Sequence, residues 1–441
     1  MPDRKAEMGS DAWCAAFERR LQKRARLSRL GHFRSVSVGK PRFIEGNQAF
    51  YLHDGRLQLE WMVAAIDHAV KRVDLEMYIF EPDQAGRRVL DALVRAAKRG
   101  VFVRLLYDSI GASNAGASFF EPLREAGGQV VEFNPVAPWR LRMGRIGRMQ
   151  HWEPNTRDHR KLLVCDAPLA WATSAEIHRS EPLPPVVPAA GERCTIAITG
   201  GRNIGDHYLT YALGEGQWRD CGVVLLGPVA IELARLFDAM WFHAEGSDLT
   251  PPRLESPICG QLRVLPLGSQ PGFLNLLQWT LGRLAVTVKK ELRISCAYFI
   301  PSLRWRRALG NVAKRTGRCA ILIPKESDVH AVDAATRHLL GSLLKAGVSV
   351  YRYALEILHE KTLIYDGVVT VVGSSNLDPR SFALNYELSV VLVGESFAKP
   401  VIAWHDEDLA SSEIYSLDEW RARPRLAKLR DWFWSLLRAQ L

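Results

Sequence analysis

Two copies of one short pattern of ionisable residues stand out in this chain of 441 residues. Each copy reads His, one residue, Lys, four residues, Asp, which gives His159, Lys161 and Asp166, and then His359, Lys361 and Asp366. Apolar residues that follow each Lys are typical of a strand, where side chains two apart share a face, so His and Lys could reach one ligand. One copy is weak evidence, but a second copy at an equivalent place makes coincidence improbable.

A motif of small residues and an asparagine follows each copy, and the pair of motifs suits chemistry on a phosphodiester. The motifs are GGRN, which ends at Asn203, and GSSN, which ends at Asn376. One neutral imidazole can attack phosphorus, and a second, protonated imidazole can protonate the leaving alkoxide. With an ordinary pKa of about 6.5, histidine supplies both forms near neutrality. Lysines and amides would hold the phosphate oxygens, so no metal or cofactor is expected.

The elements that must position these residues repeat between two halves of the chain. In the first half we expect helices at 57–72 and 85–99 and strands at 73–80, 101–108 and 129–134. In the second half we expect helices at 274–289, 303–315 and 333–346 and strands at 291–300, 318–324 and 348–353. This alternation predicts an α/β fold with a mainly parallel sheet. The halves would join near 246–257 and share one active site on a pseudo-twofold axis.

Composition narrows the class of protein and of partner. Hydrophobic residues make up 47% and charged residues 24%, which is typical of a folded globular protein. The net charge of +10 indicates an anionic partner, either lipid headgroups, nucleic acid or a phosphorylated substrate. Seven cysteines without a CxxC pair are interpreted as reduced and buried. With no signal sequence and no long apolar stretch, we expect a peripheral protein on the cytoplasmic side of the cell membrane.

Basic amphipathic segments lie near both ends of the chain. Near the start, Trp13, Phe17 and Leu21 recur every four residues among arginines and lysines. Near the end, apolar residues from Leu426 to Leu437 alternate with basic ones at helical spacing. Each segment either packs on the body of the protein or docks on an anionic bilayer, and the sequence leaves both possibilities open.

The paired motifs resemble those of the phospholipase D superfamily, in which HxKx4D followed by GSxN occurs twice in each active site. Within it, the likeness is greatest to the bacterial cardiolipin synthases, of the type that lacks transmembrane helices. Further stretches carry the likeness, namely GNQAFYLHDG, MYIFEPDQAG, NTRDHRK, TGGRNIGDHY, WRD, AYFIPS and SSNLDPRSFALNYE. The resemblance covers about 400 residues, and it implies two phospholipase D-like α-β-α halves with a phospholipid substrate.

The resemblance also implies roles for single residues. His159 would be the nucleophile and His359 the general acid. The phosphate would be held by Lys161, Lys361, Asn203 and Asn376. Asp220 and Glu387 would orient the two histidines through their other ring nitrogens, and Asp166 and Asp366, although part of the catalytic motif, would brace the local fold.

One departure separates the two copies. Six residues lie between Asp366 and Gly373, whereas 33 lie between Asp166 and Gly200. The excess, about 167–193, holds five prolines. We expect a surface excursion that leaves both of its ends in place, because loop-closure entropy rises slowly with length. The alternative is that it displaces Asn203.

These observations predict four segments and one activity. The segments are a basic amphipathic stretch at 1–40, the first repeat at 41–250, the second at 251–415 and a basic amphipathic helix at 416–441. The activity is phosphatidyl transfer that forms cardiolipin from phosphatidylglycerol and a second phosphatidylglycerol or phosphatidylethanolamine, through a phosphatidyl-histidine. The alternatives are a phospholipase D-type hydrolase or nuclease with the same site, and a non-catalytic membrane-binding protein. Nucleic acid is the less favoured substrate, since no recognised module for it is present. The oligomeric state is left open.

Overall fold

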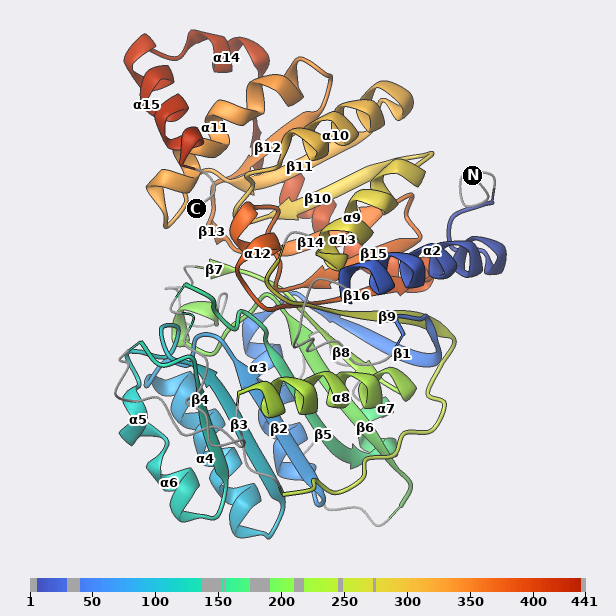
Figure 1. Cartoon of the computed structure of the whole chain (residues 1–441), viewed down its shortest axis with the longest axis vertical. Helices are drawn as coiled ribbons and strands as arrows, with labels where there is room; N and C mark the ends of the chain where they lie inside the picture. Colours follow the sequence, from blue (N-terminus) through green and yellow to red (C-terminus); the bar gives the residue numbers. More distant parts are fainter. Residues whose placement is uncertain are drawn as a thin grey trace.

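The computed structural model describes residues 6–29, 40–136, 153, 155–174, 191–209, 218–244, 249–272 and 275–437. Figure 1 shows two lobes stacked along the longest axis, with most of the first half of the sequence in one lobe and most of the second half in the other. One sheet runs through both lobes, in the order β17-β12-β11-β10-β14-β15-β16-β9-β1-β8-β6-β5-β2-β3-β4. The order of strands outward from the β9–β1 pair is the same in both directions, which gives the predicted pseudo-twofold relation.

The strands of the first lobe are β1 (Ile44–Leu52), β2 (Arg72–Met77), β3 (Phe102–Asp108), β4 (Gln129–Phe133), β5 (Leu162–Pro168), β6 (Arg193–Gly200) and β8 (Gly222–Leu226). The second lobe has β9 (Leu262–Ser269), β10 (Leu292–Cys296), β11 (Cys319–Pro324), β12 (Ser349–Tyr353), β14 (Lys361–Tyr365), β15 (Val369–Gly373), β16 (Glu387–Val393) and the edge strand β17 (Ser412–Ile414). Two short strands, β7 (Trp218–Arg219) and β13 (Ile357–Leu358), form a separate pair.

The prediction of a mainly parallel sheet is wrong. Within the described residues, only β2-β3-β4 and β10-β11-β12 are parallel sets, and the other neighbours in the large sheet are antiparallel. Helical crossovers join the parallel strands, as parallel pairing requires, whereas β14 and β15 are joined by a tight turn. In the three-residue turn, Asp366 and Gly367 have φ of 54° and 70°, the left-handed conformation that tight hairpin turns favour.

Helices cover both faces of the sheet in each lobe. The first lobe has α3 (Gly55–His68), α4 (Gln84–Lys98), α5 (Gly116–Phe119), α6 (Glu121–Glu125), α7 (Leu169–Ser174) and α8 (Pro228–His243). The second has α9 (Leu276–Thr287), α10 (Leu303–Thr316), α11 (His330–Leu344), α12 (Pro379–Ala383), α13 (Glu395–Ala410), α14 (Leu417–Ala422) and α15 (Arg425–Leu436). The result is the predicted α-β-α arrangement in each half.

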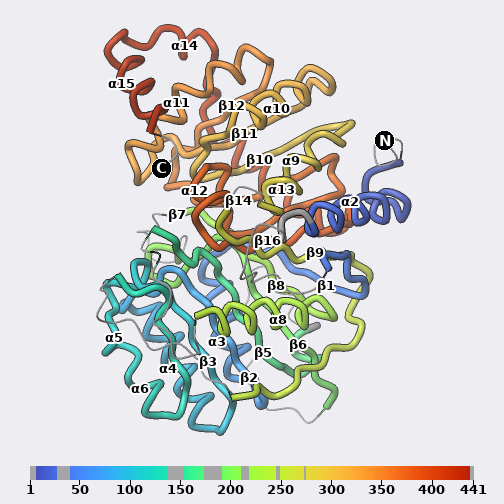
Figure 2. The backbone as a smooth tube through the Cα atoms, in the orientation of Figure 1, coloured from blue at the N-terminus to red at the C-terminus, as the bar shows by residue number. Residues whose placement is uncertain are grey.

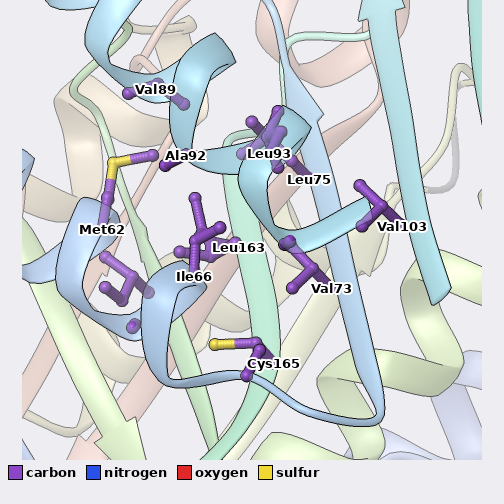
Figure 3. Packing of buried hydrophobic residues seen from close by; sticks show 14 of the residues in the cluster. Met62, Ile66, Val73, Leu75, Val89, Ala92, Leu93, Val103, Leu163 and Cys165 are labelled. Atoms are coloured by element: carbon purple, nitrogen blue, oxygen red, sulfur yellow. The ribbon is translucent and has the colours of Figure 1, made fainter. Parts of the chain in front are cut away.

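Alternate residues of the buried strands supply the two core layers of the first lobe. Leu163 and Cys165 of β5 pack with Ile66 of α3 and Leu93 of α4, as Figure 3 shows. Leu162 and Val164 belong to a second cluster, which contains the apolar side of α8 and continues into the second lobe. This period of two is what a strand covered on both faces requires. The shared layer joins the two halves through apolar contact.

The excursion at 167–193 leaves both of its ends in the sheet. β5 and β6 pair in register from Leu162 with Thr199 to Pro168 with Arg193, so the strands on either side keep their places. Residues 175–190 of the excursion lie outside the described residues. The excursion therefore does not displace Asn203, which was the alternative expectation from the sequence.

The two basic amphipathic segments differ in their packing. Trp13, Phe17 and Leu21 of α2 (Asp11–Arg29) are 0% exposed, and Phe17 lies against Trp279 of α9 with ring centroids 6.2 Å apart. Figure 2 shows this first helix lying on the lobe that the second half of the sequence forms. The apolar residues of α15 remain exposed instead. No helix in the described part of the chain is long and apolar enough to cross a membrane.

Candidate active site

The two histidines lie directly before two equivalent strands, at the boundary between the lobes. β5 begins one residue after Lys161, and β14 begins at Lys361, so each HxK segment is extended but lies at the start of its strand rather than within it. In both segments the Lys side chain contacts the His that lies two residues before it. Lys161 Nζ donates to the backbone carbonyl of His159 at 2.7 Å, and Lys361 Nζ donates to that of His359.

Each histidine is held by the other half of the chain. The backbone N–H of His159 donates to the Tyr386 carbonyl at 3.0 Å, and the backbone N–H of His359 donates to the Arg219 carbonyl at 2.7 Å. Tyr386 and Arg219 each precede a predicted orienting carboxylate. These bonds continue two short parallel pairings across the boundary, Asp158 with Tyr386 and β13 with β7. The site is therefore complete only when both halves are folded together.

The side chains of the two predicted orienting carboxylates reach the histidines. Both Glu387 carboxylate oxygens lie 3.1 Å from His159 Nδ1, and Asp220 Oδ2 lies 2.6 Å from His359 Nδ1. Because an ionised carboxylate can only accept, Nδ1 is the donor in each pair and carries the proton. In a neutral imidazole the lone pair then lies on Nε2, which is the atom available for attack on a substrate.

Burial governs the protonation of this cluster. Desolvation lowers the pKa of His159, and desolvation together with the Lys361 charge lowers the pKa of His359 to about 3. Burial alone would raise the pKa of Asp220, but Lys361 and the hydrogen bond from His359 lower it to about 2. Both imidazoles are therefore neutral at pH 7 in the absence of substrate. An arriving phosphodiester anion would favour protonation of one of them.

The two carboxylates are fixed by different contacts. Burial would raise the pKa of Glu387, but His159, Lys161 and a hydrogen bond from the Ser374 hydroxyl lower it. Asp220 Oδ1 accepts from the Cys221 N–H at 2.7 Å. A Cβ on Gly201, the residue equivalent to Ser374, would lie 2.3 Å from Asp220 Oδ1, so only glycine leaves room for this carboxylate.

The lysines and asparagines complete a set of donors around the histidines. Both lysines are 2% exposed, and burial, with the charge of Lys361, lowers the pKa of Lys161 to about 7. Asn203 Oδ1 accepts from the Ile79 N–H at 3.1 Å, and Asn376 Oδ1 accepts from the Tyr298 N–H at 3.2 Å. With each amide oxygen occupied in the same way, the amide nitrogens are the groups that can bind a phosphate oxygen, and Asn203 Nδ2 also donates one of its two hydrogens to the Tyr208 hydroxyl.

Comparison with known proteins agrees with this geometry. A profile of the family described as "Cardiolipin synthase, PLD-like domain" matches residues 62–241 and 285–409, which is more than half of the chain and includes both motifs. The chain belongs to this family. It is 29% identical to the major cardiolipin synthase ClsA of Bacillus subtilis over 397 residues, 88% of this chain and 74% of the relative. It is 30% identical to cardiolipin synthase A of Pseudomonas fluorescens over 395 residues, 89% and 74% of the two chains.

Solved structures of other proteins share the fold. The phosphatidylserine synthase of Haemophilus influenzae superposes with a TM-score of 0.63 at 14% identity, covering 89% of this chain and 95% of its own. The polyphosphate kinase of Porphyromonas gingivalis gives a TM-score of 0.50 at 12% identity, over 85% of this chain and 49% of its own. These similarities support the two-lobed architecture.

The motif aspartates of this family member lie away from the histidines. Asp166 accepts from the N–H groups of Lys71 and Arg72 at 2.9 and 3.0 Å and from Arg193 Nε at 2.8 Å. Asp366 holds the equivalent segment before β10, through the N–H groups of residues 289–291 at 2.7 to 3.1 Å. At about 3.3 Å per residue, five residues of strand put each aspartate about 16 Å from its lysine. These contacts fit the bracing role expected from the sequence, and no hydrogen bond among the described residues joins either aspartate to a catalytic histidine or lysine.

Asp366→Ala should destabilise the protein without disabling the site. It removes a charged acceptor of several backbone N–H groups and places alanine at positive φ, which together should cost about 3 kcal/mol of unfolding free energy or more. Asp366→Asn keeps an acceptor and tolerates this φ, so it should recover part of the loss. Urea denaturation measures the stability, and turnover of the folded fraction should stay within about tenfold of wild type. Unchanged stability with a greater loss of turnover would contradict the bracing role.

The pKa of His359 predicts how stability depends on pH. A base whose pKa falls from about 6.5 when unfolded to about 3 when folded binds fewer protons in the folded state, so acidification through this window favours unfolding. The slope is about 1.4 kcal/mol per pH unit at most for one proton. We expect the free energy of unfolding, measured by urea denaturation at about 25 °C, to fall between about pH 6.5 and about pH 5. The fall should be about 1 to 2 kcal/mol greater for wild type than for His359→Gln. His330→Gln, at an exposed histidine, should keep the wild-type slope, and equal slopes in all three proteins would contradict the burial effect.

Aromatic rings around the histidines had no role assigned from sequence. Tyr78 lies edge-on to His159 with ring centroids 4.7 Å apart, and Trp218 lies at the same centroid distance from His359. Tyr298 is 6.1 Å from His359, and the Tyr208 hydroxyl accepts from Asn203 Nδ2 at 2.7 Å. These rings contribute to the burial of His159 and His359, which are 9% and 5% exposed. The sequence held a signal for two of these rings, since Trp218 lies in the WRD that ends at Asp220 and Tyr208 follows GGRN, whereas Tyr78 and Tyr298 are far from either motif along the chain.

Proposed function

We propose that this protein forms cardiolipin by phosphatidyl transfer between two phospholipids, with phosphatidylglycerol as the donor. The observation that carries this proposal is the crossed pairing of His159 with Glu387 and of His359 with Asp220, each between the two halves of the chain. The relatives of this chain that are named cardiolipin synthases, at 29% and 30% identity over most of the chain, support the substrate class.

The first step transfers the phosphatidyl group to the enzyme. His159 Nε2 attacks phosphorus, a P–N bond forms and the P–O bond to the leaving glycerol breaks. His359, protonated after the anion binds, donates its Nε2 proton to the departing alkoxide. Lys161, Lys361 and the two asparagine amides hold the non-bridging oxygens, whose charge must be stabilised in the transition state.

The second step returns the phosphatidyl group to a lipid alcohol. The glycerol hydroxyl of a second phosphatidylglycerol gives its proton to His359 Nε2, and its oxygen attacks phosphorus. The P–N bond breaks, His159 regains its lone pair, and cardiolipin leaves. Water in place of the lipid alcohol would give phosphatidic acid, so the aromatic rings that dehydrate the site favour transfer.

The contacts of the two imidazoles support His159 as the nucleophile. Lys361 Nζ lies 2.7 Å from His359 Nδ1 and 3.7 Å from Asp220 Oδ2. This cation makes the His359 imidazole less basic, and hence a stronger acid once protonated. His159 faces a carboxylate that has Ser374 as its other side-chain partner, so it remains the more basic and more nucleophilic ring.

The substrates also indicate where the protein would work. Phosphatidylglycerol is a membrane lipid, so we place the protein at an anionic membrane surface, as a peripheral protein. All seven cysteines, each within the described residues, are free thiols, and this supports the cytoplasmic side.

The test is a lipid mass-spectrometric assay on purified protein. Vesicles contain phosphatidylglycerol with or without deuterated phosphatidylethanolamine, and His159→Ala protein purified in parallel controls for contaminating activity. Cardiolipin and free glycerol from phosphatidylglycerol alone would support the proposal, and deuterium in cardiolipin would make phosphatidylethanolamine a second substrate. Phosphatidic acid as the main product would replace the proposal with a hydrolase. No lipid product at all would overturn it in favour of a nuclease or a non-catalytic protein.

A further inference from the structure

The last long helix, α15, faces the protein with its polar side. Asp431 is 0% exposed and accepts hydrogen bonds from Arg423 Nη1 at 2.6 Å and from Arg337 Nη2 of α11 at 3.2 Å. Ser435, one turn later, is 2% exposed. A helix that packs on a core normally buries its apolar stripe and exposes its polar side. In α15 this arrangement is reversed.

The outward side of α15 is apolar. Six side chains on and just after the helix are 41% to 82% exposed, and together they are here named the α15 apolar face: Leu426, Leu429, Trp432, Phe433, Leu436 and Leu437. Their spacing of three, four and seven residues places them along one side of the helix. Folded proteins that act alone in water seldom expose so many large apolar side chains together, so this face marks an interaction site.

The charge around the α15 apolar face points to an anionic bilayer as its occupant. Arg425 and Arg430 of α15 are exposed, as is Arg421 of the preceding helix α14, and Lys428 of α15 is half-buried. A ring of cations around leucine, tryptophan and phenylalanine is the pattern of helices that lie in the membrane interface, with apolar residues among the acyl chains and cations at the anionic headgroups. A protein partner would not need both features on one short helix.

The place of α15 connects it with the catalytic site. Figure 1 shows the helix against α11, at the outer side of the second lobe. Trp434 packs on a small buried cluster that includes Ile300 and Leu339, and Tyr298 packs on the same cluster. The Tyr298 ring is 6.1 Å from that of His359. One layer of side chains therefore separates the helix from an aromatic ring next to the general acid.

We propose that α15 docks on anionic bilayers through its apolar face, with Asp431 as the buried anchor that turns this face outward, and so holds the catalytic histidines at the lipid surface. The inference rests on the proposed function for the identity of the surface. It assigns membrane docking to a part of the chain outside both catalytic motifs.

Vesicle flotation with the full chain tests the proposal. The test variant is Leu429→Ser with Phe433→Ser, which changes two exposed side chains and should leave the fold intact. The matched control is Leu249→Ser with Ile258→Ser, which removes two side chains that are 61% and 78% exposed in the segment that connects α8 to β9. On phosphatidylglycerol vesicles, the test variant should partition about tenfold or more less than wild type, and the control should partition as wild type does. Wild type should bind phosphatidylcholine vesicles much less.

A second readout separates docking from catalysis. With phosphatidylglycerol dispersed in detergent micelles, turnover of the test variant should match wild type, whereas on vesicles it should fall in proportion to binding. Binding that depends on the α15 apolar face without any cardiolipin product would support docking and reject the proposed function. Equal flotation of wild type and test variant would overturn the docking proposal whatever the product. A lower mass of the test variant in analytical ultracentrifugation would overturn it too, because the face would then join two copies of the chain.

Discussion

The His159→Ala variant should lose phosphatidyl transfer by about ten-thousandfold or more, the largest effect of any single change considered. Without this imidazole no P–N bond can form, and the buried donors of the site can only bind the phosphodiester. The rate of cardiolipin formation in detergent micelles measures the loss, because micelles remove any dependence on vesicle docking. Circular dichroism confirms that the variant is folded.

A substrate with a good leaving group separates the roles of the two histidines. In phosphatidyl-p-nitrophenol the leaving phenolate needs no proton, so His359→Ala should release nitrophenol at a rate within about a hundredfold of wild type. His159→Ala should release none above background. If His359→Ala is the inactive variant and His159→Ala the active one, the nucleophile and the acid are exchanged.

Glu387→Gln should lower the rate of transfer by about a hundredfold to ten-thousandfold while leaving lipid binding nearly unchanged. The Glu387 carboxylate accepts from His159 Nδ1, which lies 3.1 Å from both of its oxygens. This contact keeps the lone pair of the imidazole on Nε2. A glutamine amide can donate to Nδ1 instead, which puts the proton on Nε2 and blocks attack. The measurement is kcat and KM in micelles, with the loss expected in kcat.

Two further variants serve as controls for this effect. Asp220→Asn should act on His359 in the same way, with its loss reduced on phosphatidyl-p-nitrophenol. Ser374→Ala keeps the Glu387 carboxylate and removes one of its hydrogen bonds, so a loss of about tenfold is expected. A Glu387→Gln enzyme within threefold of wild type, about the scatter of such assays, would show that the carboxylate does not set the tautomer.

The repeated order of elements could be predicted because both halves carry strong periodicity. The expected helices and strands coincide with α3, β2, α4 and β3 within a few residues, and with their second-half counterparts from α9 to β12. Strand direction could not be predicted in this way, since a run of buried apolar residues looks the same in a parallel or an antiparallel strand. Asp366-Gly367, between two apolar runs, was the overlooked sign of a hairpin.

The pairing of carboxylates with histidines came from resemblance, and the local sequence could not have supplied it. His159 and Glu387 are separated by 228 residues, and His359 and Asp220 by 139. No local pattern encodes such contacts, which depend on how the two lobes meet. The residue roles and the segment boundaries at 40, 250 and 415 stay predictions.

The amphipathic segments show where sequence pattern stops being informative. α2 and α15 have similar periodicity and charge, yet one buries Trp13 and Phe17 and the other exposes Trp432 and Phe433. The difference lies in tertiary partners, since Trp279 of α9 receives the first helix, whereas Arg337 of α11 receives the Asp431 carboxylate of the other. Asp431 and Ser435, on the side of the helix opposite its large apolar residues, were the one local hint that α15 would turn its apolar side outward.

The covalent intermediate is the most direct test of the proposed chemistry. His359→Ala enzyme is mixed with phosphatidyl-p-nitrophenol, quenched at alkaline pH where a phosphoramidate survives, digested, and sequenced by mass spectrometry. The predicted result is one phosphatidyl group on His159, removed by mild acid and absent from His159→Ala. A phosphatidyl group on another residue, or continued cardiolipin formation by His159→Ala, would contradict a mechanism that runs through His159.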